Sequence, residues 1–295
     1  RRLLSERWAA LLVGVLTAMS GRLTWAGMSG METAPFALVS LLGIAQHERE
    51  LARCRPALIS TALLGIASLL RPEGYVLYGL ATLHRWWIAW HRTEGAERRA
   101  WLLGEVGSMA LYLGLISPYL WYSYRTTGHL LPNTFRVVSG DVRYPPLRYV
   151  REYLRLVLLD QPFVMLLVPL GLMTLIRRRA GGLLWAWAIA LPAISIFAAP
   201  RLRHHGRYTI PLLPLYLIMG VMGLMALLGW IGERFGRRAA ARWRRVLLVG
   251  PVLCVSVVVA VRWADQFAWN VDNINDMQVA LGQWAAENTP PGAAL

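Results

Sequence analysis

The sequence has no lysine and few acidic residues. All 31 basic residues are arginine, against 16 aspartates and glutamates, and charged residues make up only 16% of the 295 residues. So low a charged fraction, with 56% apolar residues and a mean hydropathy of +0.43, excludes an ordinary soluble surface and a disordered chain. The two cysteines, Cys54 and Cys254, lie far apart and exclude a disulfide-rich module. This composition is typical of an integral membrane protein.

The net charge of +15 makes nucleic acid a first candidate partner. The arginines, however, lie mostly in short stretches between apolar runs, which is how basic residues are distributed in the loops of membrane proteins. We therefore expect no nucleic-acid partner.

Nine apolar segments predict membrane-spanning helices. They lie at residues 8–20, 34–45, 56–70, 75–90, 101–122, 162–176, 183–199, 209–231 and 246–261. We expect an all-α polytopic membrane protein whose transmembrane domain covers residues 1–262. Residues 263–295 carry four acidic residues and no arginine after position 262, so they predict the start of an extracytoplasmic C-terminal region. We expect both ends of the chain to be cut from a longer protein.

The distribution of arginine predicts the orientation. With the N-terminus in the cytoplasm, the inside segments hold 18 arginines and the longer outside segments hold 11. The positive-inside rule therefore favours an inside N-terminus and an outside C-terminus. Nine of the outside arginines lie in two loops, between Arg125 and Arg155 and between Arg201 and Arg207. Arginines in outside loops are unfavourable for this orientation, and a role in anion binding explains why the loops carry them. The alternative is contact with lipid head groups or pairing with nearby acidic residues.

The first of these loops also predicts a helix. Leu147, Val150, Leu154 and Leu158 recur at helical spacing, and most arginines fall between them. Pro145 and Pro146 suit a helix start, so we expect an amphipathic helix lying on the outer membrane face rather than a further span.

Four polar strings interrupt apolar sequence on the predicted outer face. They are SGMET at 29–33, RPEG at 71–74, GHLLPNTF at 128–135 and the arginine-rich stretch at 201–208. Ionisable groups at membrane depth usually face a cavity or a partner, so four strings on one side predict a single site. Taken singly, each is also explained as a turn with an arginine reaching the interface.

In this order, and followed by RYTIPLLPLY, the strings resemble the polytopic GT-C glycosyltransferases over nearly the whole chain. The chain is similar to bacterial terminal arabinofuranosyltransferases and to the protein O-mannosyltransferase and aminoarabinose-transferase clan. The resemblance implies an enzyme, an inverting transferase that moves a sugar from a polyprenyl-phosphate donor to an extracytoplasmic glycan, lipid or protein acceptor. It also implies a catalytic aspartate in an outside loop upstream of Arg1, and no cofactor.

Arginine side chains suit the phosphate of the polyprenyl-phosphate leaving group, because two N–H groups of one guanidinium can stabilise its developing charge with paired hydrogen bonds. The candidate substrate-binding residues are Arg71, Arg201, Arg203 and Arg207, with His204, His205 and Asn133 as further candidates. A plain turn explains Asn133 nearly as well. The adjacent histidines have side chains that diverge and no carboxylate nearby, so we expect no metal there.

Glu32 and Glu73 are the candidate catalytic carboxylates within this sequence. Glu32 is also explained as a favourable charge at the N-terminus of the following helix, and Glu73 as a local ion-pair partner of Arg71 in a Pro-Gly turn. The competing functions are a transporter or a polyprenyl-lipid flippase, although a transporter should show an internal repeat and the sequence has none. A ligase that moves a whole glycan from a polyprenyl diphosphate would use similar arginines.

Overall fold

The computed structural model describes residue 4 and residues 6–54, 56–130, 145–198, 206–235 and 241–290. Every regular element within these ranges is helical, and none of them is a strand. The expectation of an all-α protein is therefore confirmed.

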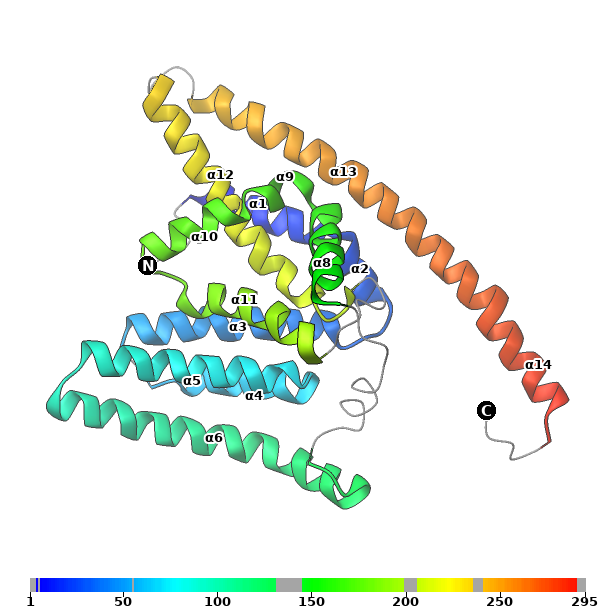
Figure 1. The fold of residues 1–295 in the computed structure, drawn as a ribbon, viewed down its shortest axis with the longest axis horizontal. Helices are drawn as coiled ribbons and strands as arrows, with labels where there is room; N and C mark the ends of the chain where they lie inside the picture. The colour runs from blue at the N-terminus through cyan, green and yellow to red at the C-terminus, as the bar shows by residue number, and fades with distance from the viewer. Residues whose placement is uncertain are drawn as a thin grey trace.

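The first half of the chain forms six described helices (Figure 1). They are α1 (Arg7–Ala18), α2 (Gly21–Met28), α3 (Thr33–Ala52), α4 (Leu58–Leu70), α5 (Glu73–Arg92) and α6 (Gly95–Thr127). Helices α3 to α6 run side by side, and α4 packs against α3, α5 and α6. The second half contributes α8 (Pro146–Asp160), α9 (Pro162–Leu166), α10 (Val168–Arg177), α11 (Gly182–Ala198), the 3₁₀ turn η2 (Ile210–Leu212) and α12 (Leu213–Phe235).

Three helical stretches are long and apolar enough to cross a membrane: Gly95–Thr127, Ile210–Arg234 and Val249–Asn288. A fourth span results if α1 and α2, which meet at a bend of 54°, are counted as one. Each of the nine predicted segments overlaps a helix, but the count of nine spans is not confirmed. Helices such as α4, with 13 residues, are shorter than the roughly 20 residues that a perpendicular span requires.

Two local predictions are wrong. Residues 21–33 lie between the first two predicted spans and are therefore expected to be an outside loop, yet residues 21–28 form α2, which Ser20 caps by accepting a hydrogen bond from the Leu23 amide. Residues 162–176 are expected to be one helix, yet the chain breaks between α9 and α10 at Leu167. Pro169 explains the break, because it has no amide hydrogen to donate to the preceding turn.

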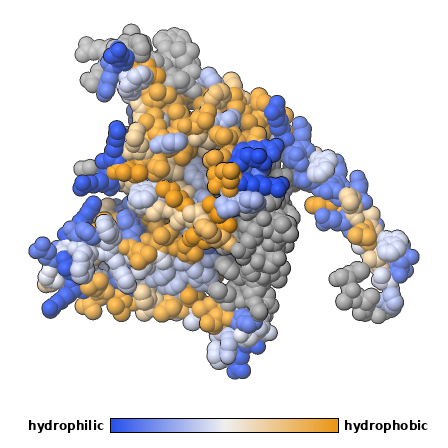
Figure 2. All heavy atoms as spheres, in the orientation of Figure 1, coloured by the Kyte–Doolittle hydropathy of each residue, from blue (hydrophilic) through white to orange (hydrophobic). Residues whose placement is uncertain are grey.

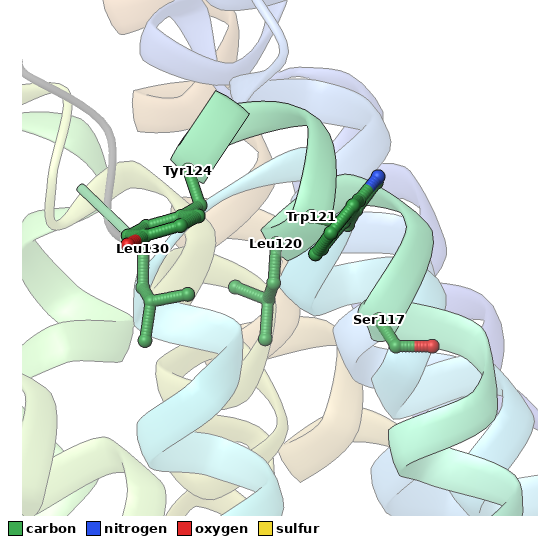
Figure 3. A pocket seen from close by; sticks show the side chains of 5 residues that line it. All are labelled: Ser117, Leu120, Trp121, Tyr124 and Leu130. Atoms are coloured by element: carbon green, nitrogen blue, oxygen red, sulfur yellow. The ribbon is translucent and has the colours of Figure 1, made fainter. Parts of the chain in front are cut away.

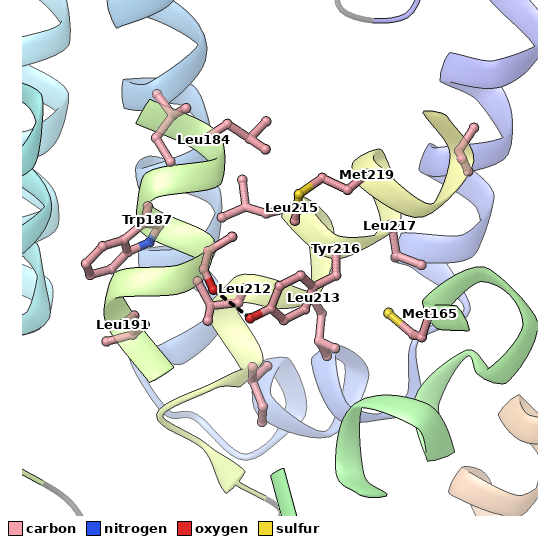
Figure 4. Close-up of a cluster of buried hydrophobic side chains, with 14 of the residues drawn as sticks. Met165, Leu184, Trp187, Leu191, Leu212, Leu213, Leu215, Tyr216, Leu217 and Met219 are labelled. Atoms are coloured by element: carbon pink, nitrogen blue, oxygen red, sulfur yellow. Dashed lines mark hydrogen bonds between the residues drawn. The ribbon is translucent and has the colours of Figure 1, made fainter. Parts of the chain in front are cut away.

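The core lies where α11 and α12 meet α1, α3, α9 and α10. Trp187, which is fully buried, and Leu184 come from α11, and Leu215 and Met219 come from α12; all four belong to the buried cluster drawn in Figure 4. The Tyr216 hydroxyl donates a hydrogen bond of 2.8 Å to the Ala188 carbonyl oxygen and joins the same two helices. Helices α10 and α12 share the most extensive contact in the described part of the chain.

The surface of the helices is largely apolar. Large side chains such as Leu103, Val106 and Leu113 of α6 are more than half exposed. In Figure 2 hydrophobic residues cover much of the visible body, and hydrophilic ones gather at the left-hand ends of the helices. Apolar patches this extensive are typical of surfaces that meet lipid or another protein.

A long helix leaves this body. Helix α13 (Ala241–Asn273) continues through the π-helical segment η3 (Ile274–Val279) into α14 (Ala280–Asn288), as Figure 1 shows. There is no break at position 263, where the sequence predicts the transmembrane domain to end. At 1.5 Å per residue, a helix of this length exceeds the roughly 30 Å thickness of a bilayer core.

Candidate functional site at the shared end of α3, α4 and α5

Arg71 joins two of the polar strings. Its Nη1 lies 2.7 Å from Glu32 Oε1, and its Nη2 lies 2.7 Å from Glu73 Oε1. The Arg71 Nε donates a second bond of 3.3 Å to Glu73 Oε2, and Nη1 also donates to the Thr33 hydroxyl at 3.1 Å. The Arg71 side chain is only 4% exposed. SGMET and RPEG are therefore brought together, as the single-site prediction requires.

The turn between α4 and α5 explains the RPEG string. Arg71 ends α4, Pro72 has the fixed φ that a helix start prefers, and Glu73 is the first residue of α5. The two helices are so close that a β-carbon on Gly74 would lie 2.4 Å from the Ser68 amide nitrogen. Glycine is therefore required at position 74, and the short turn places Glu73 against Arg71.

Glu32 immediately precedes α3, but its side chain does not cap that helix. The carboxylate turns instead to Arg71, 39 residues further along the chain. Glu32 lies at the N-terminus of α3, so a favourable helix-end charge still explains it in part, and Glu73 makes the local ion pair that the alternative interpretation describes.

The arginine-rich stretch contributes its last residues to the same site. The Arg71 guanidinium carbon lies 5.3 Å from the centre of the Tyr208 ring, and the Arg207 guanidinium carbon lies 5.1 Å from it. Arg207 Nη2 also donates a 3.2 Å hydrogen bond to the Tyr208 hydroxyl. Both arginines are at the distance at which a guanidinium is attracted by an aromatic ring.

The two predicted anion-binding arginines differ in their free donors. Four hydrogen bonds already use four of the five N–H groups of Arg71. The Nε of Arg207 is buried and has no hydrogen-bond partner, and this arginine makes one hydrogen bond in the described part of the chain. Arg207 therefore has the greater capacity for an incoming anion, and Arg71 organises the two carboxylates.

A buried polar network, which the sequence does not predict, lies next to this site. Arg22 is fully buried, and its Nη2 donates to the Gly206 carbonyl at 3.2 Å and to the Thr209 hydroxyl at 2.9 Å. Asp160, at the end of α8, accepts hydrogen bonds of 2.9 and 3.1 Å from the Ser20 hydroxyl. In the sequence only Arg22, in a segment expected to be a loop, signals the network, since Asp160, Gly206 and Thr209 are all distant from it along the chain.

This network ties the segment that carries Arg207 to α2 and α8. Burial raises the pKa of the Asp160 carboxyl above its usual range, and the nearby Arg22 charge and the Ser20 hydrogen bond oppose that rise. Asp160 therefore holds its proton more tightly in the folded protein than in the unfolded chain.

The remaining predicted binding residues lie outside the described residues. They are Asn133, Arg201, Arg203, His204 and His205. Among the residues that the structure describes, no three histidine, cysteine, aspartate or glutamate side chains are grouped as metal ligands would be.

A cavity of about 390 Å³ lies at the C-terminal end of α6. Figure 3 shows its lining, which is almost wholly apolar: Ser117, Leu120, Trp121, Tyr124 and Leu130. Arg125 stacks on Trp121, with its guanidinium carbon 4.8 Å from the ring centre. The cavity belongs to the same end of the helices as the start of α3 (Figure 1).

The fold and the site define a helical protein with apolar helices able to cross a membrane and an ion-pair cluster at one end of them. No protein-family description, curated protein or solved structure matches the chain.

Proposed function

We propose that the protein is a glycosyltransferase that moves a sugar from a polyprenyl-phosphate donor to an acceptor outside the bacterial cytoplasmic membrane, with inversion at the anomeric carbon. The observation that carries this proposal is the cluster of Glu32, Arg71 and Glu73 beside Tyr208 and Arg207. Three segments that are distant in sequence supply it, and all three belong to the predicted outer face.

The chemistry of the cluster suits this reaction. A polyprenyl-phosphate leaving group gains negative charge on a phosphate oxygen in the transition state, and Arg207 has guanidinium N–H groups that no partner among the described residues occupies and that can stabilise this charge. An acceptor hydroxyl must lose a proton, and two carboxylates lie within the same cluster. The apolar surface of the surrounding helices suits a donor whose lipid tail stays in the membrane.

Amphipathic α8 supports the proposed position of the site near a membrane surface. Leu147 and Leu154 are exposed on it, and Arg151 and Arg155 have side chains that are 75% and 69% exposed. Exposed leucine and arginine on one short helix are typical of a helix that lies in the lipid head-group region. Its last residue, Asp160, belongs to the network that holds Gly206 and Thr209 beside the site.

Transfer can be tested with the protein expressed from its complete gene and reconstituted into proteoliposomes. The probes are undecaprenyl-phosphate mannose, glucose and arabinose, each radiolabelled in the sugar, with bacterial cell-envelope material as the acceptor. We expect one donor to pass its label to the acceptor and to release undecaprenyl phosphate. Arg207→Gln should lower this rate at least about 100-fold, and exposed Arg155→Gln serves as the matched control. Movement of intact labelled lipid between leaflets, without transfer, would instead favour a flippase.

A further inference from the structure

The two carboxylates of the cluster are bound in different ways. Both oxygens of Glu73 accept hydrogen bonds from Arg71, at 2.7 Å from Nη2 and at 3.3 Å from Nε. Glu32 accepts a bond through Oε1 alone, and its Oε2 accepts none in the described part of the chain. The Glu32 side chain is 46% exposed, whereas that of Glu73 is 17% exposed. Arg71 thus engages both oxygens of Glu73, whereas Glu32 keeps one oxygen open to a ligand.

The position of Glu32 is nevertheless fixed. The Arg71 guanidinium that holds it is buried, is paired to Glu73 on its other edge, and also bonds the Thr33 hydroxyl. Aromatic rings flank this guanidinium, with the Phe36 ring centre at 5.9 Å. Because the arginine is anchored on several sides, the Glu32 carboxylate is oriented by a rigid group while its second oxygen remains accessible. A general base requires this combination of orientation and access.

Charge balance gives a second argument. A buried guanidinium needs one counter-ion, and Glu73 supplies it from the adjacent turn with two-point geometry. Glu32 is a second carboxylate on the same arginine, so the three-residue cluster carries a formal charge of −1. Neutralising Arg71 does not require Glu32, so Glu32 is available for another role, and Arg207 beside the shared Tyr208 ring brings the four charged groups to a formal charge of zero.

We propose that Glu32, in place of the upstream aspartate that the resemblance implies, is the general base that activates the acceptor, while Glu73 holds Arg71 in place. This inference rests on the proposed function. The Glu32 carboxylate takes the proton from an acceptor hydroxyl as that oxygen forms a bond to the anomeric carbon of the donor sugar. The bond between the anomeric carbon and the phosphate oxygen breaks, and its electron pair leaves with polyprenyl phosphate. Arg207 neutralises the phosphate. The acceptor is accordingly an alcohol.

This assignment separates two carboxylates that the sequence leaves equivalent. It predicts that Glu32→Gln lowers transfer at least about 100-fold, because base catalysis contributes about 100-fold to 10,000-fold. The KM for the donor should change little, since the amide can still accept a hydrogen bond from Arg71. Glu97→Gln in the first turn of α6, which is exposed, is the matched control and should transfer at the wild-type rate.

Azide distinguishes a general base from a residue with a purely structural role, because azide can restore donor turnover only in the first case. Azide is an anionic nucleophile that carries no proton, so it needs no base to attack the anomeric carbon. With the Glu32→Gln protein, azide should form a glycosyl azide and release polyprenyl phosphate, which restores donor turnover. Glu73→Gln disturbs the anchoring of Arg71 rather than the proton transfer, so azide should not restore its turnover.

The outcomes separate this inference from the proposed function. A wild-type protein that transfers no sugar from any of the three donors would contradict the proposed function. If wild type transfers and Glu32→Gln stays within about threefold of it, the base assignment is wrong. It is equally wrong if Glu32→Gln is inactive, retains wild-type thermal stability and is not restored by azide. Loss of transfer with recovery of donor turnover in azide supports it.

Discussion

Replacing Gly171 with alanine tests the close crossing of α10 and α12. A β-carbon at position 171 of α10 would lie 1.7 Å from the Met219 carbonyl oxygen of α12, whereas ordinary contact begins at 3.4 Å. The obstacle is backbone, so no side-chain rotation can remove it. Gly223 of α12 is equally confined, because its β-carbon would lie 2.2 Å from the Leu167 carbonyl oxygen. The two helices would have to separate along their whole contact.

The expected cost follows from this geometry. Overpacking a core typically costs about 1–3 kcal/mol when neighbouring side chains can yield. We expect Gly171→Ala to lie at or above about 3 kcal/mol, since here two helices must move. Gly107 of α6 is the matched control, because a β-carbon there would have nothing within 4 Å. Alanine at position 107 should stabilise the helix by up to about 1 kcal/mol.

Thermal unfolding in detergent, followed by fluorescence-detected size exclusion, measures both changes. Gly171→Ala should lower the midpoint by several degrees, and Gly107→Ala should leave it unchanged or raise it slightly. A Gly171→Ala protein that unfolds at or above the wild-type temperature would refute the close crossing of α10 and α12.

Three further predictions concern charged groups. Arg207→Ala should lower the rate of sugar transfer at least about 100-fold while leaving the thermal midpoint near that of wild type. A transfer rate equal to that of wild type would show that Arg207 takes no part in the reaction. Asp160 has a raised pKa in the fold, so the stability that this group contributes should be fully present below about pH 4 and should be lost as pH rises through the raised pKa. Asp160→Asn should abolish this slope in a pH series of thermal midpoints, and an unchanged slope would assign it to another group. Arg85 and Glu105 form an ion pair with side chains 4% and 6% exposed, so removing either alone should cost about 3–5 kcal/mol. Arg85→Met combined with Glu105→Leu should recover much of that loss in the same unfolding assay, and additive losses would contradict the pairing.

Local signals in the sequence predict much of the helical structure. The run of apolar residues after Pro145 predicts a helix, and α8 begins at Pro146. The apolar segment at 209–231 likewise coincides with η2 and α12. Such features depend on neighbours within a few residues, and hydrophobic periodicity and proline report directly on those neighbours.

Features that depend on distant partners are not predicted. Arg22 looks like a loop arginine, but the Gly206 carbonyl and the Thr209 hydroxyl satisfy it inside the protein. Nothing near position 22 announces these partners, so α2 is missed. The number of spans fails for a related reason, because whether a short apolar helix such as α4 crosses a membrane depends on the helices packed around it.

The candidate site stands between these cases. The polar strings predict that Glu32, Arg71 and Glu73 share one face of the membrane, and the structure joins them in one ion-pair cluster. The different roles of the two carboxylates are invisible in the sequence, because they depend on which oxygen atoms Arg71 bonds. The role of Tyr208 as a shared ring beside both arginines also needs the three-dimensional arrangement.

The most direct test of the account is phosphorus NMR of the donor lipid incubated with wild-type protein and acceptor in proteoliposomes. A polyprenyl-phosphate sugar is a phosphodiester, and transfer converts it into a phosphomonoester. We expect the monoester signal to grow only when acceptor is present, and to grow at least about 100-fold more slowly with Glu32→Gln. A diester signal that stays constant with every donor would contradict sugar transfer at this site.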